Sequence, residues 1–290
     1  MQRRSDFPGL IAVSALWVAL IVLPRAAFGH ADIDVRIADL TKKIDAEPAS
    51  AELYIKRGEL HRVHRDWQAA LADYRQAAEI DPQLSTVYFV RGRMLFEAKR
   101  PQDALVDLNR YLAMVGSHTR ELYREASVTR ARVLVELGRF LEASEDYTRA
   151  IGTLIRHTPE YYLERSQALA RAGLPARALE GIDEAIERAG PLVTLELYAI
   201  ELELELEQYD RALERLDAIS RWMPPERLWF RRGEILRLAG RTTEARRAYR
   251  AALELIETAP SPRSSTQAMQ NFAAQLRTAL VQLSADEKQR

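Results

Sequence analysis

The chain of 290 residues contains no cysteine, and glycine and proline are scarce at 12 residues each. The lack of cysteine excludes disulfides, thiol catalysis, thiolate metal sites and a cysteine-linked lipid. The shortage of glycine and proline leaves few residues that break helices. The sequence also lacks a Walker loop, a dinucleotide-binding glycine fingerprint, a nucleophile elbow and a zinc-protease motif. These absences favour a helical scaffold over an enzyme.

Neither sign of charge is in excess, because 42 lysine and arginine residues face 42 aspartate and glutamate residues. A nucleic-acid binder that relies on overall positive charge is therefore not expected. Apolar residues make up 47% of the chain, which is enough for a folded core. The composition thus predicts an all-α protein with no nucleic-acid partner.

The start of the chain has the pattern of a secretory signal peptide. Arg3 and Arg4 precede an uncharged stretch at 10–23, and small residues follow at Gly29 and Ala31. As a helix, this stretch of 14 residues is about 21 Å long, short of the roughly 30 Å hydrocarbon core of a bilayer. We expect export and no stable membrane insertion after signal cleavage. An uncleaved membrane anchor is the alternative.

The rest of the chain repeats at intervals close to 34 residues. An alanine recurs with separations of 34, 39, 35, 34 and 33 residues, at Ala70, Ala104, Ala143, Ala178, Ala212 and Ala245. Twelve positions before each alanine stand Gly58, Gly92, Ala131, Ser166, Ile200 and Gly233, which are small in five units of six. Small residues let two helices approach closely, and bulky residues fill the groove between them. Each unit is therefore predicted to be a pair of antiparallel helices.

These units resemble the tetratricopeptide repeat (TPR) family, most clearly at 51–84 and 226–259. The resemblance implies an all-α, right-handed helical-repeat solenoid of about six TPR helix pairs with capping helices at both ends. The expected segments are a signal peptide at 1–31, an N-terminal capping helix at 32–50, repeats over 51–259 (51–84, 85–118, 124–157, 159–192, 193–225 and 226–259), and a C-terminal capping helix and tail at 260–290.

Two departures from the pattern carry structural expectations. Five extra residues at 119–123 separate the second and third units and should extend a helix or change the local superhelical angle. The fifth unit has Ile200 and Ile219 where small residues are usual, so its helices should pack farther apart.

The resemblance also implies a binding surface for a protein or peptide, lined by the first helix of each unit. The family's spacing places the following residues there: Ile55, Glu59, Phe89, Arg93, Phe96, Val128, Arg132, Leu163, Gln167, Glu201, Leu204, Phe230, Glu234 and Arg237. Exposed aromatic residues beside arginine suit peptide capture. Packing of Phe89, Phe96 and Phe230 between units is an equally good interpretation. Glu201 and Glu205 share a helix face, which is either an acidic patch for a basic partner or a solvated surface.

Exported bacterial relatives act as assembly, secretion and envelope adaptors. The resemblance therefore implies a non-catalytic scaffold in the bacterial periplasm, such as an envelope assembly factor, without a cofactor and with an oligomeric state that the sequence does not give. One alternative is a metal or cofactor accessory protein that uses His30, or His61 and His64, three residues apart. Another is a non-catalytic subunit of an exported enzyme complex.

Signal cleavage would create a defined new N-terminus. In a Gram-negative host we expect the periplasmic form to begin at His30 or Asp32, because small residues at alternate positions precede both. Intact-mass measurement of the purified protein separates the two positions. A membrane-bound product that keeps its first 29 residues would contradict cleavage and support the anchor alternative.

Overall fold

The computed structural model describes residues 26–115, 120–153, 158–260 and 266–289, and every regular element within these ranges is helical. In chain order the elements are α1 (Ala26–Ala46), α2 (Ala51–Val63), α3 (Trp67–Ile80), α4 (Ser85–Glu97), α5 (Pro101–Val115), α6 (Arg120–Glu136), α7 (Phe140–Gly152), α8 (Pro159–Arg171), α9 (Pro175–Ala189), α10 (Val193–Glu205), α11 (Tyr209–Ala218), the 3₁₀ turn η2 (Ser220–Trp222), α12 (Pro225–Leu238), α13 (Thr242–Glu257) and α14 (Gln267–Gln289). The prediction of an all-α helical-repeat fold is confirmed. Residues 1–25, most of the predicted signal peptide, lie outside the described ranges.

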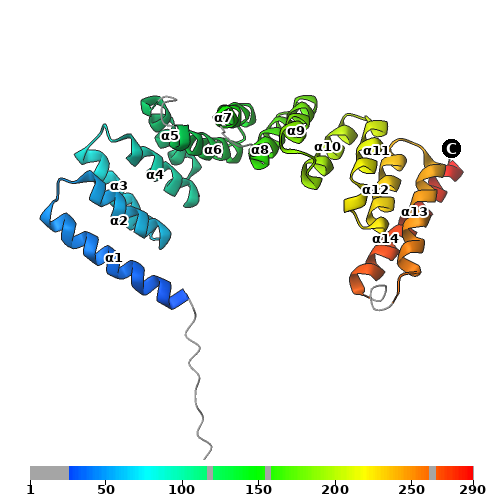
Figure 1. Cartoon of the computed structure of the whole chain (residues 1–290), viewed down its shortest axis with the longest axis horizontal. Coiled ribbons are helices and arrows are strands. Elements are labelled where there is room, and N and C mark those ends of the chain that lie inside the picture. Colours follow the sequence, from blue (N-terminus) through cyan, green and yellow to red (C-terminus); the bar gives the residue numbers. More distant parts are fainter. Residues whose placement is uncertain (1–25, 116–119, 154–157, 261–265, 290) are drawn as a thin grey trace, which may run out of the picture.

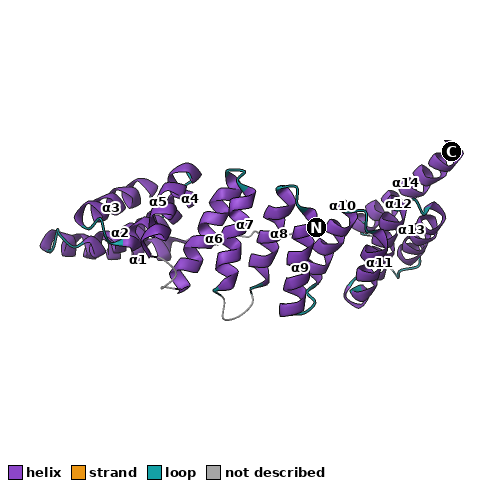
Figure 2. Cartoon of the chain, turned by 90° about the horizontal axis from the view of Figure 1, so that it is seen from above, coloured by secondary structure: helices purple, strands orange, loops and turns teal. Residues whose placement is uncertain are grey.

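The helices form an arch in which successive antiparallel pairs stand side by side (Figures 1 and 2). The first helices of the pairs lie on the concave side, and we call the surface of α2, α4, α6, α8, α10 and α12 the inner face (Figure 1). Three combinations of neighbouring first helices touch: α2 with α4, α4 with α6, and α8 with α10. Curvature explains these contacts, because elements on the inside of an arch lie closer together than those outside.

The turn inside each pair is short and uses one residue with positive φ. Glycine takes this place at Gly138, Gly173 and Gly240, with φ of 74°, 78° and 72°. Arg65 and Lys99 adopt φ of 61° in the first two pairs. A residue in the left-handed region lets the last carbonyls of a helix find donors before the chain reverses. A tight reversal places the two helices of a pair side by side and in contact.

The two helices of a pair come closest at the small residue predicted from the repeat. A Cβ atom added at Gly58 would lie 2.7 Å from the ring of Tyr74, and one at Gly233 would lie 2.5 Å from the ring of Tyr249. Both tyrosines are fully buried. The absent side chain therefore makes the space that an aromatic ring of the second helix fills.

Each of the first three pairs also contains a bidentate salt bridge between an arginine of its first helix and an aspartate of its second. Two nitrogens of Arg57 lie 2.9 and 2.7 Å from the carboxylate oxygens of Asp73. The same contact recurs at 2.6 Å from Arg91 to Asp107, and at 2.7 Å from Arg130 to Asp146. The aspartates are buried, and the bidentate salt bridge gives each of their two carboxylate oxygens a hydrogen-bond donor. These contacts fix how far the two helices slide along one another.

The fourth and fifth pairs replace this contact. Gly181 stands at the aspartate position, and Arg165 instead donates to Glu184 at 2.7 Å. In the fifth pair the charges are exchanged: Arg215, on the second helix, donates to Glu196 and Glu203 of the first, at 2.8 and 2.9 Å. Either helix can carry the cation, because the contact needs only opposite charges across a short gap.

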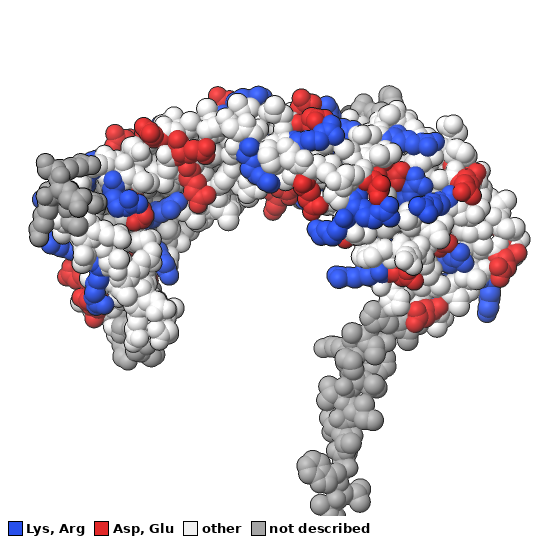
Figure 3. All heavy atoms as spheres, turned by 180° about the vertical axis from the view of Figure 1, so that it is seen from behind, with Lys and Arg blue, Asp and Glu red and all other residues white. Residues whose placement is uncertain are grey.

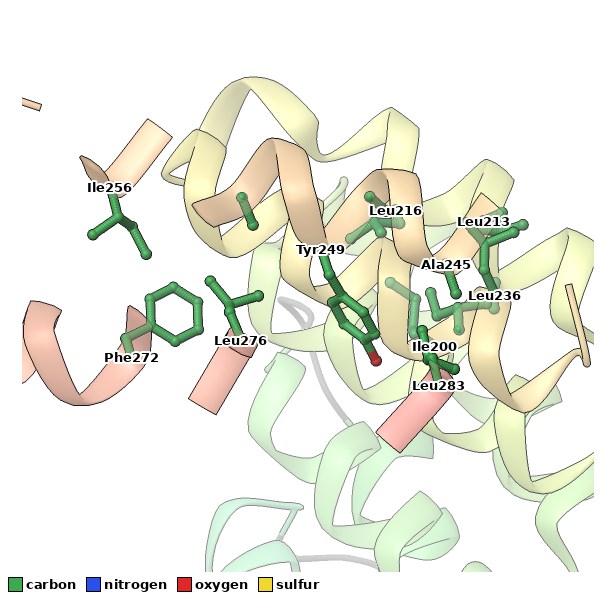
Figure 4. Packing of buried hydrophobic residues seen from close by; sticks show 14 of the residues in the cluster. Ile200, Leu213, Leu216, Leu236, Ala245, Tyr249, Ile256, Phe272, Leu276 and Leu283 are labelled. Atoms are coloured by element: carbon green, nitrogen blue, oxygen red, sulfur yellow. The ribbon is translucent and has the colours of Figure 1, made fainter. Parts of the chain in front are cut away.

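The last pair is covered by α14, as expected of a capping helix. Phe272, Leu276 and Leu283 of α14 are buried; Phe272 and Leu276 lie near Ile256 and Tyr249 of α13 (Figure 4). Met269 and Leu280 pack partly against the same cluster. The backbone N–H of Met269 donates to the Thr266 hydroxyl at 3.3 Å, which caps the helix start. This helix keeps the final apolar face of the arch from water.

The other end is covered less completely. The helix α1 packs on α2, but only Ile44 of its described side chains is buried, and Val35 is 69% exposed. The helix begins at Ala26, earlier than the predicted start of the cap at residue 32, so both predicted cleavage positions lie within its first turns.

The extra residues between the second and third units lengthen a helix. The helix α6 begins at Arg120 and has 17 residues, whereas α2, α4, α8 and α10 have 13 each. In the fifth pair Ile200 and Ile219 are fully buried, and the second helix stops after 10 residues at Ala218 and continues as η2. The extra residues at 119–123 thus lengthen α6, as expected, while the wider spacing expected in the fifth pair stays a prediction.

Substitution of Gly58 by alanine tests the close approach. We expect Gly58→Ala to lower the free energy of unfolding by about 1–2 kcal/mol, because overpacking against Tyr74 outweighs the gain in helix propensity. The matched control is Gly152→Ala in α7, where an added Cβ would meet no atom within 4 Å, and it should raise stability slightly. Urea unfolding measures both variants, and equal effects at the two positions would contradict the packing argument.

Candidate functional site

A pocket of about 480 Å³ opens in the middle of the inner face. Helices from four successive pairs contribute to it, so it exists only in the assembled arch. We call it the central pocket; it is lined by Phe96, Arg132, Val135, Glu136, Tyr147, Glu164, Gln167, Ala168, Ala170, Arg171 and Tyr198. Its volume falls within the roughly 300–1,000 Å³ of ligand pockets in general.

Small residues on α8 make room for the pocket. Ala168 and Ala170 line it, and the aromatic rings of Phe96, Tyr147 and Tyr198 bound it from α4, α7 and α10. Tyr147 is buried, whereas Phe96 and Tyr198 are partly exposed. Burial, followed by the nearby carboxylates of Glu201 and Glu205, raises the pKa of Tyr198 to about 12. The pocket therefore offers apolar and aromatic surface to a ligand.

A hydrogen-bonded group of three side chains forms one wall of the central pocket. Arg132 of α6 donates two hydrogen bonds to Glu164 of α8, at 2.9 and 2.8 Å, and the Tyr147 hydroxyl donates to the same carboxylate at 2.6 Å. Burial raises the pKa of Tyr147, and the bond to Glu164 raises it further. Burial acts to raise the pKa of Glu164 too, but the hydrogen bonds from Arg132 and Tyr147 outweigh it and lower that pKa. This wall is held in one arrangement before any ligand arrives.

A similar group stands at the N-terminal end of the inner face. Glu59 of α2 accepts hydrogen bonds from the Tyr74 hydroxyl at 2.5 Å, from Arg93 at 2.7 Å and from Arg62 at 3.2 Å. Arg62 also donates to Glu97 at 2.8 Å. The group joins α2, α3 and α4, so a partly buried network of hydrogen bonds and ion pairs links the first two pairs.

A second pocket of about 630 Å³ lies between α1 and α2. Its lining consists of Val35, Arg36, Asp39, Leu40, Lys43, Ile55, Lys56, Glu59 and Leu60. The lining mixes aliphatic and charged side chains, and five of its nine residues belong to the helix α1. This second pocket adjoins the Glu59 group.

Five of the predicted groove residues line a pocket. Phe96, Arg132 and Gln167 line the central pocket, and Ile55 and Glu59 line the second. Arg93 joins them indirectly through its bond to Glu59.

Two predicted groove residues are corrected by their burial. Phe89 and Val128 are each only 3% exposed and line neither described pocket, so they pack between helices. The ring of Phe89 lies 5.3 Å from that of Tyr111 in the second helix of its own pair. For Phe89 the packing interpretation therefore holds, because the first helices also carry the core of each pair.

Phe230 is half-buried and packs against the core of the last pair. Its ring lies 6.0 Å from that of Tyr249 and 5.2 Å from that of Phe272, so the capping helix α14 takes up its contact surface. Leu163 and Leu204 likewise pack partly against buried clusters.

The remaining predicted residues lie on the surface of the later pairs. Glu201 is exposed and lies 3.6 Å from Arg231. Glu234 accepts from the Tyr249 hydroxyl and lies 3.4 Å from the exposed Arg237. Neither of the two described pockets includes these residues, and their role in a groove stays a prediction.

Tyr147, Glu164 and Tyr198 line the central pocket but were not predicted. Tyr147 stands four positions after Ala143, and every unit has a bulky residue at this position. Glu164 stands two positions before the small residue Ser166, where the repeat gives no functional signal. A pocket assembled from four pairs depends on distances between units, which periodicity along one unit does not contain.

The two histidines proposed as metal ligands contact different carboxylates. A ring nitrogen of His61 lies 4.0 Å from Asp73, and one of His64 lies 3.9 Å from Asp34. Within the described ranges, His, Cys, Asp and Glu side chains form no group of three or more able to hold a metal ion. The side chain of His30 lies outside the described residues.

Across the part of the chain that the structure describes, no helix combines the length and apolar character needed to cross a bilayer.

Acid titration tests the Glu164 group. We expect Glu164→Gln to lower the unfolding free energy by about 1 kcal/mol at neutral pH, because it removes a charge-assisted contact with Arg132. A carboxyl group with a lowered pKa stabilises the fold above its unfolded-state pKa of roughly 4.3, and this contribution disappears as the pH falls through its folded-state pKa. The difference between wild type and variant should therefore shrink below pH of about 4.

Urea unfolding at a series of pH values gives this difference directly. The control is Glu187→Gln at an exposed position of α9, which should show a small difference at every pH. A Glu164→Gln difference that stays constant down to pH 3 would contradict the assigned contact.

The repeat seen in the fold is also found when the chain is compared with known protein families. Tetratricopeptide repeat profiles match residues 51–84, 128–192 and 199–261, together more than half of the chain. Protein SGT1 homolog of Oryza sativa subsp. japonica is 32% identical over 80 residues, which are 28% of this chain and 22% of that protein. The present chain thus matches about a fifth of the length of that relative.

Two solved structures show the same fold at low identity. YrrB, a TPR protein with an unusual peptide-binding site, is 21% identical with a TM-score of 0.53, over 73% of this chain and 97% of that one. A tetratricopeptide repeat protein from Parabacteroides merdae is 16% identical with a TM-score of 0.51, over 87% of this chain and 95% of that one. With its repeat, its arch of helix pairs and these matches, the chain belongs to the tetratricopeptide repeat family.

Proposed function

We propose that the protein is a non-catalytic adaptor that binds an extended segment of a partner protein along its inner face. The observation that carries this proposal is the central pocket, where an apolar, aromatic lining stands beside a wall of fixed hydrogen-bonding groups. A bulky side chain of the partner would enter the pocket and bury apolar area, while polar groups at the wall position the backbone. YrrB, with its peptide-binding site, has the same fold and supports this mode of binding.

The electrostatics favour binding over catalysis. The pKa of Tyr147 is raised and that of Glu164 is lowered, so near neutral pH each group keeps its ordinary charge state. A general acid or base needs a pKa near the working pH, and both shifts move away from it. Positive and negative side chains are interspersed over the arch (Figure 3), which suits a protein partner whose charges pair locally.

The second pocket extends the same surface toward the N-terminus. It adjoins Glu59, which bonds to Arg93 on the next inner helix, so polar side chains continue from α2 to α4. A segment bound along the arch would contact both pockets, and its affinity would come from several weak contacts held on one preformed scaffold.

We place this adaptor outside the cytoplasm, as a factor that assists assembly of an envelope or exported protein. The support is the basic and apolar pattern that ends at Gly29 or Ala31, which is that of a secretory signal peptide.

Site-specific photocrosslinking in cells tests the binding surface. We expect a benzoylphenylalanine at Gln167, which is exposed and lines the central pocket, to form adducts with a partner protein. The matched position is Arg177, which is exposed on the outer helix α9 and should form none. Adducts from Arg177 alone would move the binding site to the outer surface and contradict the proposal.

A further inference from the structure

Most charged side chains around the central pocket are already paired. Arg132 is held by Glu164, and Lys99 donates to Glu136 at 3.2 Å. These pairs neutralise one another and leave little net charge for a ligand to recognise.

Arg171, in the last turn of α8, differs from these groups. Its side chain lines the central pocket and is exposed, and its guanidinium lies 4.3 Å from the centre of the Phe140 ring. Among the side chains that the structure describes, no carboxylate pairs with it. Stacking on Phe140 leaves the edge of the guanidinium, with its N–H donors, available to an anionic group.

Glu205 is the opposite charge on the neighbouring inner helix. It is exposed near the C-terminal end of α10, and it acts electrostatically on Tyr198, which lines the central pocket. Within the described ranges it makes no ion pair, whereas its neighbour Glu201 lies 3.6 Å from Arg231. One cation on α8 and one anion on α10 thus remain for a ligand.

The spacing of the two helices sets the spacing of the ligand's charges. The helices α8 and α10 touch, and packed helix axes lie about 8–10 Å apart. An extended peptide advances about 3.3 Å per residue, so a segment that crosses both helices passes from one to the other in about three residues.

We propose that the central pocket selects an extended peptide segment with an acidic and a basic residue about three positions apart and a bulky apolar residue between them. The acidic group meets Arg171, the apolar side chain enters the pocket beside Tyr198, and the basic group meets Glu205. Charge complementarity on both sides of one apolar contact sets the register of the segment. This inference rests on the proposed function and adds the chemistry of the partner.

Arg171 also stabilises the helix α8, and the experiment must separate this effect from recognition of a peptide. A cation in the last turn of a helix stabilises the helix through its dipole, and loss of this effect changes stability alone. Ligand preference is therefore the quantity to measure, because a helix-end effect does not alter which peptides are bound.

The experiment is selection from a random 12-residue phage-displayed peptide library on the purified protein and on two single variants. We expect the wild type to enrich an acidic and a basic residue around a bulky apolar one. Arg171→Glu leaves two acidic groups and should enrich two basic residues in the peptide, whereas Glu205→Lys should enrich two acidic ones. For one selected peptide, each variant should weaken binding by about three- to tenfold at low salt.

Two further variants separate this inference from the proposed function. Gln167→Trp fills the central pocket and should abolish enrichment, whereas Arg177→Glu on the outer helix α9 should leave the selected motif unchanged. Loss of enrichment with Gln167→Trp, together with selection of the wild-type motif by Arg171→Glu and Glu205→Lys, would overturn the roles of Arg171 and Glu205 and leave inner-face binding standing. Absence of enriched peptides, or peptides indifferent to Gln167→Trp, would overturn inner-face binding and the assignment with it.

Discussion

The structure depends on the close approach of the two helices in each pair. At Gly58 and Gly233 no side chain separates the backbone from a buried tyrosine ring of the second helix. The residue that follows the small one then faces the inner surface, as Glu59, Arg132 and Gln167 do at the two pockets. One packing requirement thus sets both the core of each pair and the positions that can contact a partner.

Ionic contacts add a second level of order to this packing. The arginine–aspartate contacts at Arg57, Arg91 and Arg130 lie within pairs, whereas Arg132 and Glu164 join neighbouring pairs. The contacts within pairs hold the two helices of a unit together, and the Arg132–Glu164 contact joins α6 to α8. The proposed binding surface would therefore be formed before a partner arrives, which lowers the conformational cost of binding.

The periodicity of the sequence predicts the helix pairs because small and bulky residues recur in each unit. Two charged residues also recur in the sequence: an arginine directly before the small residue, such as Arg91, and an aspartate three positions after the alanine, such as Asp107. The salt bridge between them was not predicted. The central pocket could not be found in this way, because Phe96, Tyr147 and Tyr198 come from different pairs. The sequence is compatible with Phe89 at the groove surface or in the core, and its 3% exposure in the structure assigns it to the core.

The central claim is that the inner face of the middle pairs binds an extended segment of a partner. Hydrogen exchange of the protein with and without a bound peptide selected on it tests this claim most directly. We expect slower exchange of amides in α6, α8 and α10, whose residues line or flank the central pocket, and unchanged exchange in α9 and α11. Protection confined to the outer helices, or to α1 and α2 alone, would contradict it.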